Sequence, residues 1–307
     1  MQVRRVVLRS LSLALALVVF GASAYADDLS AVFVYGDSLS DNGNLHSHVG
    51  LPDPPYYQGR FSNGPVTVEQ LAATLNVPLY DFAWAGATTG IGNSLDSGTQ
   101  TAIGFLSLPG MLTQLAGYTV PPALIPTSLF VVWGGANDFE INASPLVAAA
   151  DIVNIVTTLQ SEGAKNILVP GLPDLGLTPE FYGDPAATAF TDQFNAALQA
   201  SLPAGTTYFD VDALLNQIVA NPGAYGFTNV TDPCFNGTTV CANPDQYLYW
   251  DDIHPTTAAD AILAANFRSA VTPEPSSIVL LGSGIAGITG TLLRRRKSRR
   301  NPLEYQN

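Results

Sequence analysis

Residues 31–38 read Ala-Val-Phe-Val-Tyr-Gly-Asp-Ser, an apolar run that ends at a glycine and offers a serine directly afterwards. Five consecutive apolar or aromatic residues predict a short strand that is buried on both faces. Gly36 breaks this strand, so Ser38 is presented at its carboxyl end as a candidate nucleophile. Gly-Asp-Ser also occurs in ordinary turns, so the motif needs support from elsewhere in the chain.

The rest of the chain alternates short apolar runs with helical patterns. This alternation predicts an α/β fold, a three-layer α/β/α sandwich around a mainly parallel sheet. Pro145 after the cap candidate Ser144, the pair Asp184-Pro185, and Thr257 each open a predicted helix. The predicted strands are residues 31–35, 78–82, 129–133, 166–169 and 207–211.

A histidine and two carboxylates stand together near the far end of the chain, at Asp251-Asp252-Ile253-His254. A serine hydroxyl becomes a good nucleophile only when a base takes its proton and a third group orients that base. His254 has a carboxylate at fixed spacing, whereas His46 and His48 lie in the loop that follows the first strand. Composition alone cannot choose between Asp251 and Asp252 as the orienting group.

Two further segments also follow predicted strands. Gly86 comes after the strand at 78–82, and Asn137 comes after the strand at 129–133. Sites in open α/β sheets form at the carboxyl ends of strands, so these two residues and Ser38 are predicted to meet at one edge. A glycine at such an edge lets the backbone approach a substrate closely.

Together these segments resemble, in order, the four sequence blocks of the SGNH, or GDSL-type, serine esterases and lipases. The resemblance spans about residues 31–270 and implies a flavodoxin-like SGNH hydrolase fold and an acyl-enzyme mechanism. It favours Asp251 over Asp252, because the family places its aspartate three residues before the histidine. The implied catalytic residues are Ser38, Asp251 and His254, and the implied oxyanion hole consists of the N–H groups of Ser38 and Gly86 and the side-chain amide of Asn137.

The resemblance implies hydrolysis of carboxylic or lipid esters. Segments 40–44 and 243–247 resemble the branch of lipases, phospholipases and haemolysin-like acyltransferases. The alternatives are a lipid acyltransferase, a deacetylase that acts on envelope polysaccharide, and a non-catalytic surface-binding protein that kept the fold. His46 and His48 have no further ligands near them in sequence, so neither a metal nor another cofactor is predicted. Leu106, Leu108, Met111, Leu112 and Leu115 are candidates either for an acyl pocket or for ordinary core.

Both ends of the chain differ in pattern from the predicted hydrolase domain, residues 27–271. Residues 1–26 have early arginines, an apolar run and Ala24-Tyr25-Ala26, the layout of a secretory signal peptide, with an uncleaved anchor helix as the alternative. Residues 272–300 hold Pro-Glu-Pro, an uncharged stretch at 276–293 that is long enough to span a membrane, and a basic cluster; a short polar tail, 301–307, follows.

This tail resembles the PEP-CTERM sorting signal of Gram-negative bacteria. The resemblance implies an exosortase-type processing enzyme as a partner, transient anchoring in the inner membrane, and a final place in the cell envelope or outside the cell. A plain carboxyl-terminal membrane anchor is the alternative.

The charge of the chain excludes some partners. Between Asp27 and Leu293 there are three basic and 24 acidic residues, a formal charge of −21. Such a surface repels nucleic acid and anionic membranes. Cys234 and Cys241 are predicted to form a disulfide because the chain carries an export signal, with free thiols as the alternative.

Overall fold

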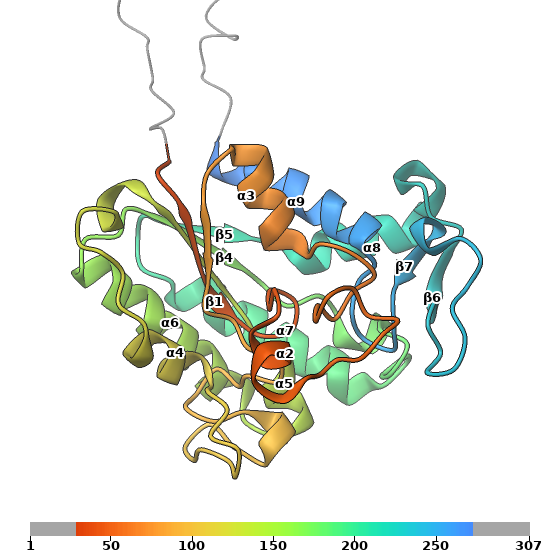
Figure 1. Ribbon diagram of the computed structural model, residues 1–307, viewed down its shortest axis with the longest axis horizontal. Helices are drawn as coiled ribbons and strands as arrows, with labels where there is room; N and C mark the ends of the chain where they lie inside the picture. The colour runs from red at the N-terminus through yellow and green to blue at the C-terminus, as the bar shows by residue number, and fades with distance from the viewer. Residues whose placement is uncertain (1–28, 273–307) are drawn as a thin grey trace, which may run out of the picture. The chain divides into compact units, whose positions relative to one another are not determined.

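The computed structural model describes residues 29–272 (Figure 1). At its centre lies a five-stranded sheet in the order β2-β1-β3-β4-β5, and every neighbouring pair of strands runs parallel. The predicted α/β fold with a parallel sheet is confirmed, and so are the predicted strands, with shifts of one or two residues at their ends. The strands are β1 (Val32–Gly36), β2 (Leu79–Asp81), β3 (Leu129–Trp133), β4 (Asn166–Pro170) and β5 (Thr206–Phe209).

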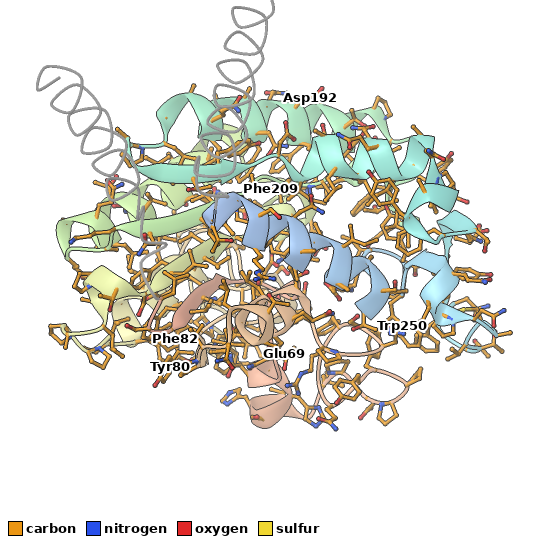
Figure 2. The ribbon with its side chains drawn as sticks, turned by 90° about the horizontal axis from the view of Figure 1, so that it is seen from above. Glu69, Tyr80, Phe82, Asp192, Phe209 and Trp250 are labelled. Atoms are coloured by element: carbon orange, nitrogen blue, oxygen red, sulfur yellow. A yellow bond between two sulfur atoms is a disulfide. The ribbon has the colours of Figure 1, made fainter. Side chains whose placement is uncertain are left out.

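Helices cover both faces of the sheet, because alternate residues of a strand point in opposite directions. Phe33 and Tyr35 of β1 pack on the side of α4 (Met111–Gly117), α6 (Pro145–Ser161) and α7 (Pro185–Ser201). Val32 and Val34 pack on the side of α3 (Thr67–Leu75), α8 (Val211–Ala220) and α9 (Thr257–Val271). Figure 2 shows Phe209 of β5 beside α9, where its ring lies 5.0 Å from that of Phe267.

The three predicted helix starts are observed. Asp184 caps α7 with its side chain, which accepts a hydrogen bond from the Ala186 N–H (2.8 Å). Ser144 precedes α6 as predicted, but its hydroxyl makes no cap hydrogen bond. Its backbone carbonyl instead accepts the Ala148 N–H, which starts the helical hydrogen-bond series.

A small second sheet adjoins the segment that leads to His254. It pairs β6 (Asn229–Pro233) with β7 (Tyr247–Tyr249) in parallel. Directly after β6, Cys234 and Cys241 form a disulfide, and the Cys234 N–H donates to the carbonyl of Tyr249. The disulfide-closed loop is thereby fastened to the strand that ends two residues before Asp251.

Short elements complete the described part of the chain, namely α2 (Asn44–Val49), α5 (Ala136–Glu140) and the 3₁₀ turns η1 (Ser94–Asp96), η2 (Ile125–Thr127), η3 (Leu175–Leu177), η4 (Pro222–Tyr225) and η5 (Pro244–Gln246). Within residues 29–272, none of the helices is long and apolar enough to cross a membrane. The predicted signal peptide (1–26), membrane segment (276–293) and basic cluster lie outside the described residues.

Candidate active site

The turn after β1 carries Ser38. Gly36 is required there because a Cβ at this position would lie 2.6 Å from the carbonyl oxygen of Trp133. The buried side chain of Gln114 holds the same residue, since it accepts the Gly36 N–H (3.0 Å) and donates to the Gly36 carbonyl (2.8 Å). Asp37 is fully buried, and Ser38 is partly exposed. Ser38 therefore stands at the carboxyl edge of the sheet on a fixed turn.

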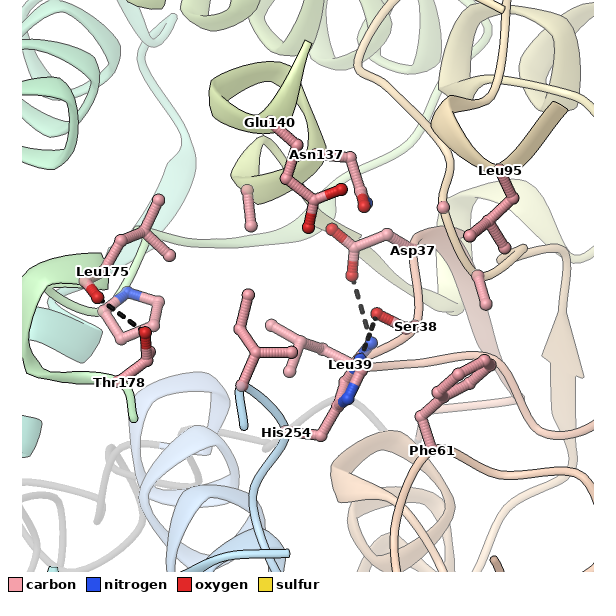
Figure 3. Close-up of a pocket in the computed structure, with 15 residues that line it drawn as sticks. Asp37, Ser38, Leu39, Phe61, Leu95, Asn137, Glu140, Leu175, Thr178 and His254 are labelled. Carbon is pink, nitrogen blue, oxygen red and sulfur yellow. Dashed lines mark hydrogen bonds between the residues drawn. The ribbon is translucent and has the colours of Figure 1, made fainter. Parts of the chain in front are cut away.

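A continuous chain of hydrogen bonds joins Ser38, His254 and Asp251. The Ser38 Oγ lies 2.8 Å from Nε2 of His254, a contact drawn in Figure 3. Nδ1 of His254 lies 2.8 Å from Oδ2 and 2.9 Å from Oδ1 of Asp251. The backbone N–H groups of Ile253 and His254 donate to Asp251 Oδ1 at 3.0 and 2.7 Å, which fixes the carboxylate. With a proton on Nδ1, Nε2 is free to accept the hydroxyl proton of Ser38.

The electrostatics of the site favour an ion pair between His254 and Asp251. Burial opposes the charged form of His254, but the carboxylate of Asp251 outweighs it, so the pKa of His254 is raised. Burial likewise opposes the charge on Asp251, yet His254 and the two backbone donors leave the pKa of Asp251 lowered. An imidazolium that forms during proton transfer is therefore stabilised where it stands.

The neighbouring Asp252 lies outside this chain of contacts. Its side chain is exposed, and its backbone carbonyl accepts the Glu180 N–H at 2.8 Å. Of the two adjacent carboxylates, the geometry brings Asp251 to His254.

Tyr56 contacts the same carboxylate, and no motif in the sequence marked it. Its hydroxyl donates to Asp251 Oδ2 at 2.8 Å. Its ring packs edge-on against Phe61 and Trp250, at centroid distances of 5.6 and 6.2 Å. The ring of Phe61 in turn lies 4.9 Å from the ring of His254. The loop between α2 and α3 thus encloses His254 and Asp251.

Gly86 and Asn137 lie on the other side of Ser38. Gly86 has φ +77°, and a Cβ there would collide with Oδ1 of Asn93, so both conformation and space require glycine. The Asn137 side-chain amide donates to the Ala87 carbonyl at 3.0 Å, which leaves its second N–H for the cavity. Among the described residues, the N–H groups of Ser38 and Gly86 donate to no protein acceptor. Figure 3 shows Ser38 between His254 and Asn137.

One cavity, of about 110 Å³, is lined by Ser38, Gly86, Asn137 and His254. A second, apolar cavity of about 60 Å³ lies beside it, between the sheet and helices α8 and α9. The two cavities share four wall residues, namely Leu39, Pro173, Thr178 and Ile253. The apolar side of the site therefore continues past Ile253.

The proposed acyl-pocket residues from 106 to 115 do not line the cavity beside Ser38, so that interpretation is wrong. Leu108 and Met111 are buried core, and Leu106 is exposed. Leu112 and Leu115 line a different cavity, beside α4 and α6. They belong to the helix that covers the sheet, which the apolar pattern could not distinguish from a pocket wall.

Two carboxyl groups at the cavity, those of Asp37 and Glu140, were not among the predicted site residues. Burial raises the pKa of Asp37 to about 7, and Oδ2 of Asp37 has no hydrogen-bond partner within residues 29–272. Glu140 of α5 also lines the cavity, and burial raises its pKa. Figure 3 shows the carboxyl groups of Glu140 and Asp37 on the same side of the cavity.

His46 and His48 lie on α2. The ring of His48 packs edge-on against Trp84 at 5.6 Å. In the part of the chain that the structure describes, no three His, Cys, Asp or Glu side chains are grouped so that they would hold a metal ion.

Comparison with known proteins identifies the family. Residues 32–267 match the family described as GDSL-like Lipase/Acylhydrolase. The chain belongs to this family. The GDSL family and its named esterase relatives make the protein an ester-bond hydrolase.

Named relatives of this GDSL hydrolase come from bacteria and plants. The thermolabile hemolysin of Vibrio parahaemolyticus is 28% identical over 79% of this chain, which spans only 64% of that relative. The phosphatidylcholine-sterol acyltransferase of Aeromonas hydrophila is 25% identical over 76% of this chain and 88% of the relative. A GDSL esterase/lipase of Arabidopsis thaliana is 26% identical over 76% and 87%.

Solved structures similar to this GDSL hydrolase include an acetylxylan esterase from Geobacillus stearothermophilus. That structure has 14% identity and a TM-score of 0.47, and the match covers 81% of this chain and 97% of the esterase. At the carboxyl end, residues 271–297 match the PEP-CTERM protein-sorting motif.

Proposed function

We propose that this GDSL hydrolase is exported and cleaves carboxylic or lipid esters through an acyl-enzyme on Ser38. The observation that carries the proposal is the chain of 2.8 Å contacts from Ser38 to His254 and from His254 to Asp251. Nε2 of His254 takes the hydroxyl proton as Oγ of Ser38 bonds to the carbonyl carbon. The same proton then passes to the leaving alcohol, and the acyl group stays on Ser38. His254 next deprotonates a water molecule, which releases the acid and restores the serine.

The negative oxygen of each tetrahedral intermediate would lie between the N–H groups of Ser38 and Gly86 and the free N–H of Asn137. Support comes from their common cavity and from the fixed positions of Gly86 and Asn137. Removal of one such donor commonly costs about 10²–10³ in turnover, or about 2.7–4 kcal/mol. Asn137→Ala is therefore expected to fall in that range.

The acyl group of the substrate would extend past Ile253 into the apolar second cavity. The walls that the two cavities share support an apolar acyl chain rather than a charged one. A relative named for acyl transfer to a sterol supports a second outcome, in which an alcohol replaces water at the deacylation step. Added alcohol would then yield a new ester in place of the acid.

A panel of p-nitrophenyl esters from acetate to palmitate tests the proposal. Ser38→Ala is expected to abolish turnover and labelling by a fluorophosphonate probe while the fold stays intact. Ser47→Ala, a change on the exposed face of α2, is the matched control and should keep both. Labelling that persists in Ser38→Ala would assign the nucleophile elsewhere, and wild-type protein without turnover on any ester would refute the proposal.

Residues 1–26 would be cleaved off during export. An exosortase-type enzyme would then process the sorting tail, residues 272–300, which follows the hydrolase domain at 27–271. The match of residues 271–297 to the sorting motif supports a route of export used by Gram-negative bacteria. The tail would anchor the protein in the inner membrane until it is processed. Intact mass of the protein from the envelope fraction tests both ends: the expected chain begins at Asp27 and lacks Arg294–Arg300. A mass that includes either end would refute that half of the proposal.

A further inference from the structure

The short turn η1 and the loop that follows it expose large apolar side chains close to one another in sequence. Phe105 is 76% exposed and Ile103 52%, and Leu106 and Leu95 are also exposed. We call Leu95, Ile103, Phe105 and Leu106 the apolar loop patch. A single exposed leucine needs no explanation, but a group of large apolar residues on one loop marks an interaction site.

The loop is built to hold these side chains outward. Asp96 is fully buried, and its Oδ2 accepts the backbone N–H groups of Leu106 and Leu108, each at 3.0 Å. The backbone carbonyl of Asp96 accepts the Phe105 N–H at 3.1 Å. Leu108 is buried against the cluster of Leu45 and Ala85. A fixed backbone with one leucine turned inward leaves Phe105 and Leu106 facing solvent.

The patch adjoins the catalytic cavity. Leu95 belongs both to the patch and to the wall of the cavity that holds Ser38. The hydrogen bonds that Asp96 accepts from the backbone N–H groups of Phe105 and Leu106 bring that part of the patch next to Leu95. In Figure 1 this loop, coloured orange to yellow, lies beyond α5 at the carboxyl edge of the sheet.

The charge pattern indicates what kind of surface would cover the patch. Residues 97–137 contain no Asp, Glu, Lys or Arg, whereas residues 29–272 as a whole hold 21 acidic and three basic residues, a formal charge of −18. An anionic lipid surface would repel this domain, and a surface without net charge would not. Ile103, Phe105 and Leu106 lie in this charge-free stretch, and Asp96 beside Leu95 is buried. Apolar side chains in such a setting can enter the boundary between head groups and acyl chains.

We propose that the apolar loop patch docks the hydrolase onto a zwitterionic phospholipid surface, with the catalytic cavity facing the lipid. This inference rests on the proposed function, since it names the form in which the ester is presented. A substrate molecule would pass from the lipid surface along Leu95 to Ser38. Esters dissolved as single molecules would reach Ser38 without the patch.

A fluorescent label at position 105 tests the docking in the full chain. Cys234 and Cys241 are bonded to each other, so a single cysteine introduced by Phe105→Cys takes an environment-sensitive dye alone. We expect a blue shift of the dye with phosphatidylcholine vesicles and a weaker one with phosphatidylglycerol vesicles. Ser161→Cys, an exposed position at the carboxyl end of α6 and away from the disulfide, is the control and should give no shift. Because the dye is attached to the loop, its shift reports the surroundings of position 105 and not membrane binding by the carboxyl-terminal tail.

Steady-state kinetics provide a second test of the docking surface. Phe105→Ser is expected to lower turnover of vesicle-borne phosphatidylcholine about tenfold and to leave p-nitrophenyl acetate turnover unchanged, with Val240→Ser unchanged on both. Absence of a dye shift at position 105, an equal shift at position 161, or an equal loss on both substrates would overturn the docking surface. Wild-type protein without turnover on any p-nitrophenyl ester would instead refute the proposed function, which the dye experiment does not depend on.

Discussion

The hydroxyl of Tyr56 donates a hydrogen bond of 2.8 Å to Oδ2 of Asp251, the carboxylate that also contacts His254. Tyr56 and Asp251 are separated by 195 residues, and they meet because the loop before α3 packs against the segment that carries His254. A hydrogen bond to the charged carboxylate stabilises its negative charge, by about 1.5–3 kcal/mol for bonds of this type. Tyr56 therefore lowers the basicity of Asp251, and this weakens the stabilisation that Asp251 gives to protonated His254.

Tyr56→Phe keeps the ring among its aromatic neighbours and removes only this donor. Asp251 then becomes more basic and favours the imidazolium more strongly, so the pKa of His254 rises further. We expect the acidic limb of the kcat/KM profile to move up by about 0.5 pH unit, or about 0.7 kcal/mol. Tyr57→Phe, which changes a neighbouring tyrosine that does not contact Asp251, should leave the profile in place. A Tyr56→Phe profile that falls uniformly at every pH would mean that the tyrosine acts only through structure.

Asp251→Ala is expected to lose far more turnover than Asp252→Ala. Asp251 contacts His254 through both oxygens, whereas Asp252 is exposed and contributes a backbone carbonyl to Glu180. We expect a gap of at least about tenfold in kcat, which corresponds to about 1.4 kcal/mol in the barrier. Steady-state kinetics of the two variants on one p-nitrophenyl ester measure it. Equal losses, or a larger loss in Asp252→Ala, would assign the orienting role differently.

Asp37 should make the fold less stable as the pH rises. Burial raises its pKa to about 7 in the folded protein, so between its ordinary value near 4 and pH 7 the folded state holds a proton that the unfolded chain has lost. Its contribution to stability is therefore complete below about pH 4 and declines towards pH 7, by about 4 kcal/mol at most.

Asp37→Asn cannot ionise and should remove this part of the pH dependence, measured by urea unfolding at pH 5 and pH 8. Asp138 and Asp260, whose pKa values burial also raises, to about 6 and about 7, remain in both proteins and cancel in the comparison. Asp192→Asn, a change at an exposed position on α7, should behave as the wild type does. The expectation fails when Asp37→Asn and the wild type lose equal stability between the two pH values.

Ile253→Ala should shift the acyl preference towards longer chains. Ile253 belongs to the wall between the cavity of Ser38 and the apolar cavity beside α8 and α9. Its removal joins the two spaces, so the ratio of octanoate to acetate turnover is expected to rise by about threefold or more. Val240→Ala, a change at an exposed position that lines neither cavity, is the control. An unchanged ratio would place the acyl chain on another path.

Short-range pattern was enough to predict the elements of the sheet and the residues of the motifs. Strands such as β1 and β3 are buried on both faces, so each reads as a continuous apolar run that ends at a glycine turn. Helices of 15 residues or more gave a clear start at Pro145, Pro185 and Thr257. The five- and six-residue helices α5 and α2 gave no such signal, because they span less than two turns.

The sequence by itself determined the order of Ser38, Gly86, Asn137 and His254 along the chain. It also placed the first three after strands, and parallel strands bring their carboxyl ends to one edge. Only the tertiary structure decided which groups surround them. Tyr56 reaches Asp251 through packing of distant loops, and Ile253 forms a cavity wall only because α8 and α9 lie behind it. Leu108 and Phe105 illustrate the same limit: both are apolar and three residues apart, yet hydrogen bonds to buried Asp96 turn one inward and leave the other exposed. Contacts between residues far apart in sequence set burial and direction, and no local pattern records them.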